Sequence, residues 1–492
     1  MKRAATAAIA VLGVVSLAVG RQQLPATQTT TAPARTATPN IILVMIDALR
    51  ADGLEVYGNP RSLSPTIDAV AAKGVVFDSC IAPAPWTLPS VVSIFCSRYP
   101  EAHGITDHRK AKASPWGRTK ASAPPVRFLP TLAESLKARG YATAAFVANA
   151  YIRRGVYLTQ GFDVYDSSFA ANTTPGSTLN DAAIDWLRQR DPARPFFIYL
   201  HYMDVHGPYD AGPEFLDDLL DAVEQSPQKH RLSPASLSAL PNYLRPLSDR
   251  ATDPERHERL EIYREYWVAR YEAGIREFDH YLADLRGRLR EMRLWGDAYI
   301  IITADHGEAL GEHGLWHHGL SAHHTDLHVP FILRWPGALP AGRRVPGPVS
   351  LIDLMPTIIE QLGLPSPPGL QGVSLCASIR ALTPPPPRPV FAEAVKFKPQ
   401  QRAVYFGDWK LMSLRGSLHR LYHLADDPAE RQDLVDKQPE RFRLLQDILR
   451  RQIEQDARLA GDTDIQPVPL TPEDVERLKS LGYIEPRPVP FD

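Results

Sequence analysis

The sequence predicts an α/β fold, a mostly parallel sheet sandwiched by helices, with a small antiparallel sheet near the C-terminus. Continuous apolar runs, typical of strands buried on both faces, occur at residues 41–46, 142–147, 196–200 and 299–303. Helix signals lie between these runs, and repeated strand–helix–strand units favour parallel pairing. A stiff connector, TPPPPRP, comes later in the chain. The short strand-like runs after it predict the antiparallel sheet, followed by terminal helices.

The helices between the strands have recognisable ends. Ser64 precedes a proline and is predicted to cap a helix that Gly74 ends, after which residues 75–77 form another strand. Thr131 and Glu134 have the spacing of a capping box and predict the start of a second helix. In such folds, sites form where the strands end.

Length and composition favour one large domain and a smaller one. The chain has 492 residues, a main domain is predicted over 40–382 with a charged insertion at about 214–265, and a C-terminal subdomain over 390–492. With 55 basic and 56 acidic residues, the net charge of −1 supplies no field that would recruit nucleic acid or an anionic membrane. The 3 cysteines predict neither a disulfide framework nor a zinc ribbon.

The N-terminus is typical of an export signal. Lys2 and Arg3 precede an apolar stretch, and small residues follow at 18–20. We therefore expect a signal peptide over 1–20, a disordered spacer over 21–39 and a secreted or periplasmic protein. The apolar stretch is short for a membrane span, so none is expected after cleavage, although an uncleaved anchor is the alternative.

Polar residues with metal-binding and acid–base chemistry follow the predicted strands. They are Asp47 after 41–46, Asp305 and His306 after 299–303, His201, Asp204 and His206 after 196–200, and His313, His317 and His318 in GEHGLWHHG. Each alone is weak evidence, because a single carboxylate or histidine at a strand end has ordinary structural uses. Together, carboxylate oxygens with an imidazole and a hydroxyl predict a site for a divalent metal such as Ca, Mg, Mn or Zn.

Thr87 has two interpretations. It lies in APAPWTLPSVVSIF, at the start of an apolar helix-like run. A hydroxyl in the first turn of a helix can cap a backbone N–H. It can also be a nucleophile, since the positive end of the helix stabilises the anion that it attacks.

The ordered motifs of the chain resemble those of a known family. PNIILVMIDALRADGLEVYG, PAPWTLPSVVSIFCSRYPEAHG, HYMDVHGPY, TADHGEALGEHGLWHHG, HVPFILRWPG and LIDLMPTIIEQLGLP look like the motif series of the sulfatases, in the alkaline phosphatase-like superfamily. GDWKL, LYHLADDPAERQDL and DVERLKSLGYI look like that family's C-terminal subdomain. The resemblance covers nearly everything after Asn40 and implies an alkaline phosphatase-like catalytic domain.

The resemblance also implies roles for individual residues. Metal ligands would be Asp47, Thr87, Asp305 and His306; Thr87 would also be the nucleophile; His206 and His318 would contact the anionic oxygens of the substrate; Arg50, His201 and His313 would be further substrate-binding residues. The expected cofactor is a divalent ion, Ca, Mn or Zn. Either His206 or His318 could protonate the leaving alcohol.

The chain departs from the sulfatase pattern at two positions. Sulfatases carry Cys or Ser in a Cys-x-Pro-Ser-Arg motif that is converted to formylglycine, whereas this chain has Thr87 and, at the arginine position, Val91. The usual second Asp after Asp47 is replaced by Ala48. Threonine cannot form that aldehyde, but it is the normal nucleophile in branches of the superfamily that transfer or hydrolyse phosphoryl groups.

The sequence therefore predicts a metal-dependent hydrolase of a sulfate or phosphate ester. The substrate would be a small molecule or a glycan, and no nucleic acid partner is expected. One alternative is a phospho-group transferase that works through a covalent threonine intermediate. The other is a catalytically silent, sulfatase-like binding protein.

Overall fold

The computed structural model describes residues 38–106, 130–153, 157–169, 174–224, 254–394, 400–414 and 416–460. The predicted signal peptide, nearly all of the predicted spacer and residues 461–492 of the predicted C-terminal subdomain lie outside these ranges. Within the ranges, no helix has both the length and the apolar character needed to cross a membrane.

The predicted mostly parallel sheet is confirmed. Its nine strands are β1 (Ile41–Ile46), β2 (Val75–Ile81), β3 (Ala142–Val147), β4 (Val164–Asp166), β5 (Phe196–Tyr202), β6 (Tyr299–Ala304), β9 (His328–Val329), β10 (Phe331–Arg334) and β11 (Arg343–Ser350). They are ordered β11-β2-β10-β6-β1-β5-β3-β4, with β9 beside β2. β1 pairs in parallel with β5 and β6, while β9 and β10 run antiparallel to their neighbours.

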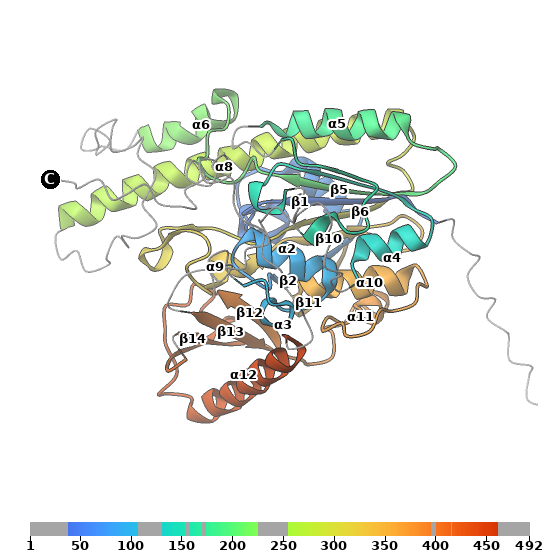
Figure 1. Cartoon of the computed structure of the whole chain (residues 1–492). Helices are drawn as coiled ribbons and strands as arrows, with labels where there is room; N and C mark the ends of the chain where they lie inside the picture. The colour runs from blue at the N-terminus through green and yellow to red at the C-terminus, as the bar shows by residue number, and fades with distance from the viewer. Residues whose placement is uncertain are drawn as a thin grey trace, which may run out of the picture. The chain divides into compact units, whose positions relative to one another are not determined.

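Helices cover both faces of this sheet (Figure 1). On one side, α8 (Pro254–Glu291) contacts α1 (Pro65–Ala71), α5 (Gly176–Gln189) and α6 (Pro213–Glu224). On the other side, α2 (Thr87–Cys96) contacts α4 (Leu132–Ala138) and α10 (Leu354–Gln361). Shorter elements are α3 (Pro100–His103), α9 (His324–Leu327), α11 (Cys376–Ala381) and the ribbon of β7 (Ala309–Leu310) with β8 (Trp316–His317). The predicted insertion at 214–265 includes α6 after its first residue and the beginning of α8, and its residues 225–253 lie outside the described ranges.

The strand and capping-box predictions hold at the level of individual residues. β1 and β3 have the predicted bounds, whereas β2, β5 and β6 extend further, to Ile81, Tyr202 and Ala304. At the start of α4, the Thr131 hydroxyl accepts a hydrogen bond from the Glu134 N–H at 3.1 Å, and the Glu134 carboxylate accepts from the Thr131 N–H at 3.0 Å.

The cap predicted for α1 is wrong. The Ser64 hydroxyl donates to Asp68 at 3.0 Å and makes no capping bond. Instead, Asp279 of α8 accepts hydrogen bonds from the first N–H groups of α1, those of Thr66 and Ile67, at 2.9–3.0 Å. A carboxylate from another helix has therefore taken the place of the local cap.

The predicted antiparallel sheet is also confirmed, and it has four strands. They are β12 (Val390–Ala394), β13 (Gln401–Phe406), β14 (Trp409–Leu414) and β15 (Leu418–His423), and α12 (Pro439–Ala460) packs on them. A separate apolar cluster that includes Val404, Leu411, Leu445 and Leu449 joins this sheet to α12.

Candidate active site

Two candidate metal ligands meet at the carboxyl edge of the parallel strands. Ile46, the last residue of β1, lies beside Ala304, the last residue of β6, so Asp47 and Asp305 follow at the same edge. The Asp47 N–H donates to the carbonyl of Tyr202 on β5 at 2.9 Å, which holds the end of β1 in place. Asp47, Asp305 and the neighbouring His306 are fully buried.

Thr87 lies against these residues as the first residue of α2. Its Oγ1 is 3.3 Å from Asp47 Oδ2 and 3.4 Å from His306 Nε2. The helix has no side-chain cap, because the cap position is Trp86. The Ser90 hydroxyl donates to the Asp305 carbonyl at 2.6 Å and fixes this helix against the end of β6. The Thr87 hydroxyl therefore points into the acidic cluster and does not cap the helix.

Asn149, which sequence reasoning missed, contacts both Asp47 and Thr87. Its Nδ2 donates to Asp47 Oδ2 at 2.6 Å and to Thr87 Oγ1 at 3.2 Å. Its Oδ1 accepts from the Tyr151 N–H at 2.7 Å, which fixes the orientation of the amide. The available signal was its position just after the predicted strand at 142–147, the same signal that identified Asp47.

The electrostatics of the cluster fit a bound cation. Among the described residues, neither Asp47 Oδ1 nor Asp305 Oδ2 accepts a hydrogen bond, although they lie 3.3 Å and 3.6 Å from His306 Nε2. Burial and the charge of Asp47 raise the pKa of Asp305 to about 6. Burial opposes a charge on His306, but the two carboxylates outweigh it and raise the pKa of His306 to about 10. Buried carboxylates that hold positive charge, beside a hydroxyl and an imidazole, are a donor set suited to a divalent metal.

His318 and His206 lie next to this cluster. The ring of His318 is 4.3 Å from that of His306 and 5.0 Å from that of His206. The Nδ1 of His318 donates to Glu308 Oε1 at 3.0 Å, and Glu308 Oε2 accepts from the Tyr209 hydroxyl at 2.8 Å. Burial raises the pKa of Glu308, and neighbouring histidines offset only part of that rise. Glu308 is a second residue that sequence reasoning missed.

His201 points at Asp47. Its Nε2 is 2.9 Å from Asp47 Oδ2, and its Nδ1 is 2.6 Å from the hydroxyl of Tyr199, two residues earlier on β5. Burial alone would raise the pKa of Asp47, but its contacts with His201 and His306 outweigh burial and hold that pKa well below its usual range. His201 therefore lies with the carboxylates of the predicted metal site.

Arg50 lies apart from the Thr87 cluster. Its guanidinium is bound by Asp52 at 2.7 Å and by Glu312 at 2.9 Å, and it donates to the Glu308 carbonyl at 3.1 Å. With His313, it lines a cavity of about 930 Å³ whose walls also include residues 428–431. Thr87, His206 and His318 are not among the lining residues.

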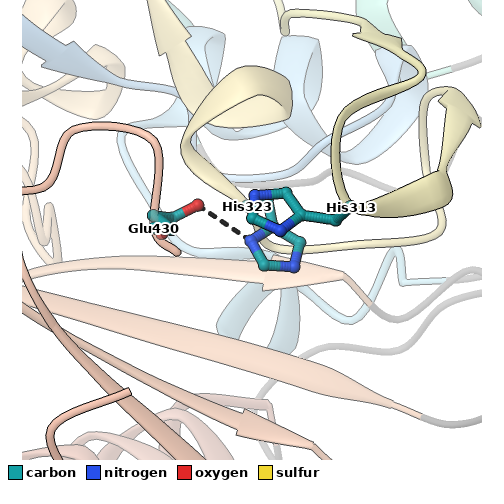
Figure 2. A group of neighbouring side chains, drawn as sticks. All are labelled: His313, His323 and Glu430. Atoms are coloured by element: carbon teal, nitrogen blue, oxygen red, sulfur yellow. Dashed lines mark hydrogen bonds and ion pairs between the residues drawn. The ribbon is translucent and has the colours of Figure 1, made fainter. Parts of the chain in front are cut away.

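His313 belongs to a junction with the C-terminal sheet (Figure 2). Its ring stacks on that of His323 with centroids 3.8 Å apart and planes 7° from parallel, and Nδ1 of His323 donates to Glu430 at 2.8 Å. Glu430 also accepts from Lys410 and from the His324 N–H. A metal lies in the ring plane of each histidine that binds it, so two parallel stacked rings do not share one ion. We interpret the group as an ionic junction.

Proteins of known type resemble the chain over most of its length. It is 23% identical over 395 residues to the arylsulfatase of Clostridium perfringens, covering 68% of this chain and 77% of that one. It is 26% identical over 352 residues to the N-acetylgalactosamine-6-sulfatase of Sus scrofa, covering 68% of this chain and 65% of that one.

Solved structures share the fold. One, in complex with its substrate D-glucosamine-2-N,6-O-disulfate, has a TM-score of 0.66 at 19% identity and covers 87% of this chain and 99% of its own. The phosphonate monoester hydrolase of Agrobacterium radiobacter has a TM-score of 0.64 at 19% identity, with 85% and 96% covered.

Two family models match the chain. The model described as "N-sulphoglucosamine sulphohydrolase, C-terminal" matches residues 311–458, which include the four-stranded sheet and most of α12. The Sulfatase model matches residues 39–364, which include the nine-stranded sheet and the Thr87 cluster. Since that match spans well over half of the chain, this protein belongs to the sulfatase family of ester hydrolases.

Proposed function

We propose that this chain is a metal-dependent hydrolase of a sulfate or phosphate ester, with Thr87 as the nucleophile. The observation that carries the proposal is the position of Thr87 Oγ1, 3.3 Å from Asp47 and 3.4 Å from His306 in a fully buried cluster. A threonine that served only as a helix cap would bond to a backbone N–H of the helix and not to Asp47 and His306. The positive end of α2 also favours the anionic group of an ester at this point.

Asp47, Thr87, Asp305 and His306 would hold the metal. Two of their carboxylate oxygens accept no hydrogen bond from the described residues, and the donor set is compatible with Ca, Mn or Zn. When bound, the ion would favour the alkoxide form of the Thr87 hydroxyl and neutralise charge on the ester.

The surrounding side chains would carry the remaining steps. The Thr87 hydroxyl gives up its proton to water, and Oγ1 attacks the sulfur or phosphorus atom. A bond from Oγ1 to that atom forms, and the bond from that atom to the leaving alcohol oxygen breaks. The proton that this oxygen takes up comes from His318 or His206. Asn149 donates to Thr87 Oγ1 and would stabilise negative charge on that oxygen. Glu308 accepts from His318 and fixes the orientation of its ring. Water then hydrolyses the threonine ester, which releases inorganic sulfate or phosphate and restores the hydroxyl.

We propose a glycan or small-molecule ester as substrate. The support comes from relatives: one named as an N-acetylgalactosamine-6-sulfatase and one solved with a glucosamine disulfate. The phosphonate monoester hydrolase among the structural neighbours keeps phosphorus esters within the proposal. The cavity lined by Arg50 and His313 would receive a part of the substrate away from the reacting group.

The test is a panel of aryl sulfate, phosphate monoester, phosphodiester and phosphonate substrates, assayed with added Mn, Zn and Ca. Thr87→Ala should lower turnover of the preferred substrate about 1,000-fold or more, and Thr87→Ser should retain measurable activity. Wild-type turnover in Thr87→Ala would overturn the covalent route. Transfer of the group to an added alcohol instead of water would identify a transferase.

We also propose that the chain is exported and that the mature protein begins near Arg21. The support is the basic and apolar N-terminal pattern. N-terminal sequencing of protein recovered from cell fractions tests this. An intact Met1 on the protein would contradict cleavage and favour a retained anchor.

A further inference from the structure

We propose that His201 Nε2 is a ligand of the metal in this centre and takes over from the acidic residue that Ala48 replaces. The inference rests on the proposed metal-dependent function. Ala48 is buried, has a left-handed backbone with φ of 61°, and its methyl group offers no donor atom. Its carbonyl accepts a hydrogen bond from the Tyr271 hydroxyl at 2.9 Å. Position 48 therefore supplies no second acidic ligand.

His201 reaches the same place from the neighbouring strand. It pairs with Met45 in the register of β1 and β5, and its Nε2 lies 2.9 Å from Asp47 Oδ2. One ligand atom each of Asp47, His201 and Asp305 lies within 4.8 Å of the others, and all three side chains are fully buried. Two ligands of one ion, each at about 2.0–2.2 Å, are separated by roughly 3–4 Å, so this arrangement has the size of a coordination site.

Tyr199 fixes the orientation of the His201 imidazole through its second ring nitrogen. Its hydroxyl lies 2.6 Å from His201 Nδ1, and both side chains are fully buried. When Nδ1–H donates to this hydroxyl, the lone pair of a neutral imidazole is on Nε2, which is the atom that faces Asp47. Histidine ligands of metals are commonly held in this way by a hydrogen bond at the second ring nitrogen.

With His201, the ligand set becomes two carboxylates, one hydroxyl and two imidazoles. Imidazole ligands suit Zn and Mn better than Ca, whose preferred ligands are oxygens. The inference therefore narrows the proposed cofactor to a metal that accepts two nitrogen ligands.

The experiment measures metal binding directly, without an activity assay. Metal-free wild-type protein and variants are titrated with Zn, Mn and Ca by calorimetry, and the visible absorption of Co²⁺-loaded protein reports the ligand set. His201→Ala should weaken Zn or Mn binding at least 10-fold and alter the Co²⁺ spectrum. Tyr199→Phe should weaken binding about 10-fold with all ligands still present. His103→Gln is the control, because His103 is also fully buried but binds Ser93 on the far part of α2.

Failure of the inference and failure of the proposed function give different results. Wild-type affinity and an unchanged Co²⁺ spectrum in both His201→Ala and Tyr199→Phe would show that His201 is no ligand, while metal-dependent catalysis could stand. Wild-type protein that binds none of these metals would overturn both. Tyr199→Phe keeps the inference testable if His201→Ala does not fold, and thermal unfolding of the metal-free variants checks this.

Discussion

Glu308 and His318 form a hydrogen-bonded pair next to His306, which itself contacts Thr87. The carboxylate accepts from Nδ1 of His318 at 3.0 Å and from the Tyr209 hydroxyl at 2.8 Å. Both members of the pair are fully buried. Glu308 can therefore set the orientation of the His318 ring without contacting the substrate itself, which makes it a positioning residue.

Removal of Glu308 should lower kcat more than it changes KM. Glu308→Ala leaves the His318 ring without its acceptor, and we expect kcat to fall about 10- to 100-fold. Glu308→Gln keeps an oxygen that can accept from His318, so its kcat should lie between that of Glu308→Ala and that of the wild type. Steady-state kinetics over a range of pH measure both, with Glu360→Ala, at an exposed surface pair with Arg380, as control. Wild-type kcat in Glu308→Ala would exclude the positioning role.

Asn149→Ala should reduce turnover strongly with the metal still bound. Its amide donates to both Asp47 and Thr87, and loss of one donor of this kind costs about 10²–10³ in kcat. Asn149→Asp should be at least as damaging, because it puts a third carboxylate beside Asp47. Asn180→Ala is the comparison: this buried amide binds the Tyr281 carbonyl, so its loss should affect unfolding and spare kcat. Equal kcat in Asn149→Ala and wild type would remove Asn149 from the mechanism.

The site residues that the sequence predicts best are those whose positions depend on a local sequence pattern. An apolar run that ends in Asp47, and another that ends in Asp305 and His306, predict strands, and parallel pairing then brings the ends together. The register of β1 with β5 and β6 is a consequence of that pairing. The capping box of Thr131 is local in the same way.

The residues that were missed depend on contacts between distant segments. Asn149 and Glu308 are ordinary polar residues until α2 and the loops after β3 and β6 are folded against each other. Ser64 has the right local sequence for a cap, but Asp279 of α8 accepts the hydrogen bonds from the first N–H groups of the helix in its place. His313 is close in sequence to His318, yet it lies in the junction with Glu430. It belongs to the short 3-10 helix Glu312–Gly314, and β8 (Trp316–His317) comes between it and His318.

The cap of α1 provides a prediction about stability. Asp279→Ala removes the acceptor for two buried N–H groups, those of Thr66 and Ile67, and should lower the free energy of unfolding by about 1–3 kcal/mol. Ser64→Ala should cost less, because that hydroxyl makes no capping bond. Urea-induced unfolding of both variants measures the difference. A larger loss in Ser64→Ala than in Asp279→Ala would contradict this account of the helix end.

The ion pair of Lys410 with Glu430 provides the last prediction. Both side chains are buried, with 0% and 3% exposure, and Glu430 also accepts from His323 at 2.8 Å. Glu430→Gln leaves the Lys410 charge without its partner and should cost about 3–5 kcal/mol at neutral pH, whereas Glu430→Gln combined with Lys410→Met should cost less than the single change. Urea-induced unfolding of the wild type, of Glu430→Gln, of Lys410→Met and of the double variant completes the cycle.

The same pair fixes the sign of a pH dependence. Burial alone would raise the pKa of Glu430, but Lys410 and His323 outweigh it and hold that pKa well below its usual range. A carboxyl group with a lowered pKa in the folded state stabilises the protein fully above its unfolded pKa of about 4.3, and this stabilisation is lost as the pH falls below that value. The difference in free energy of unfolding between wild type and Glu430→Gln should therefore shrink as the pH falls below about 4.5. Both proteins must be folded in the absence of urea at each pH. If their difference in free energy of unfolding stays constant down to about pH 3, the Glu430 charge does not stabilise this junction.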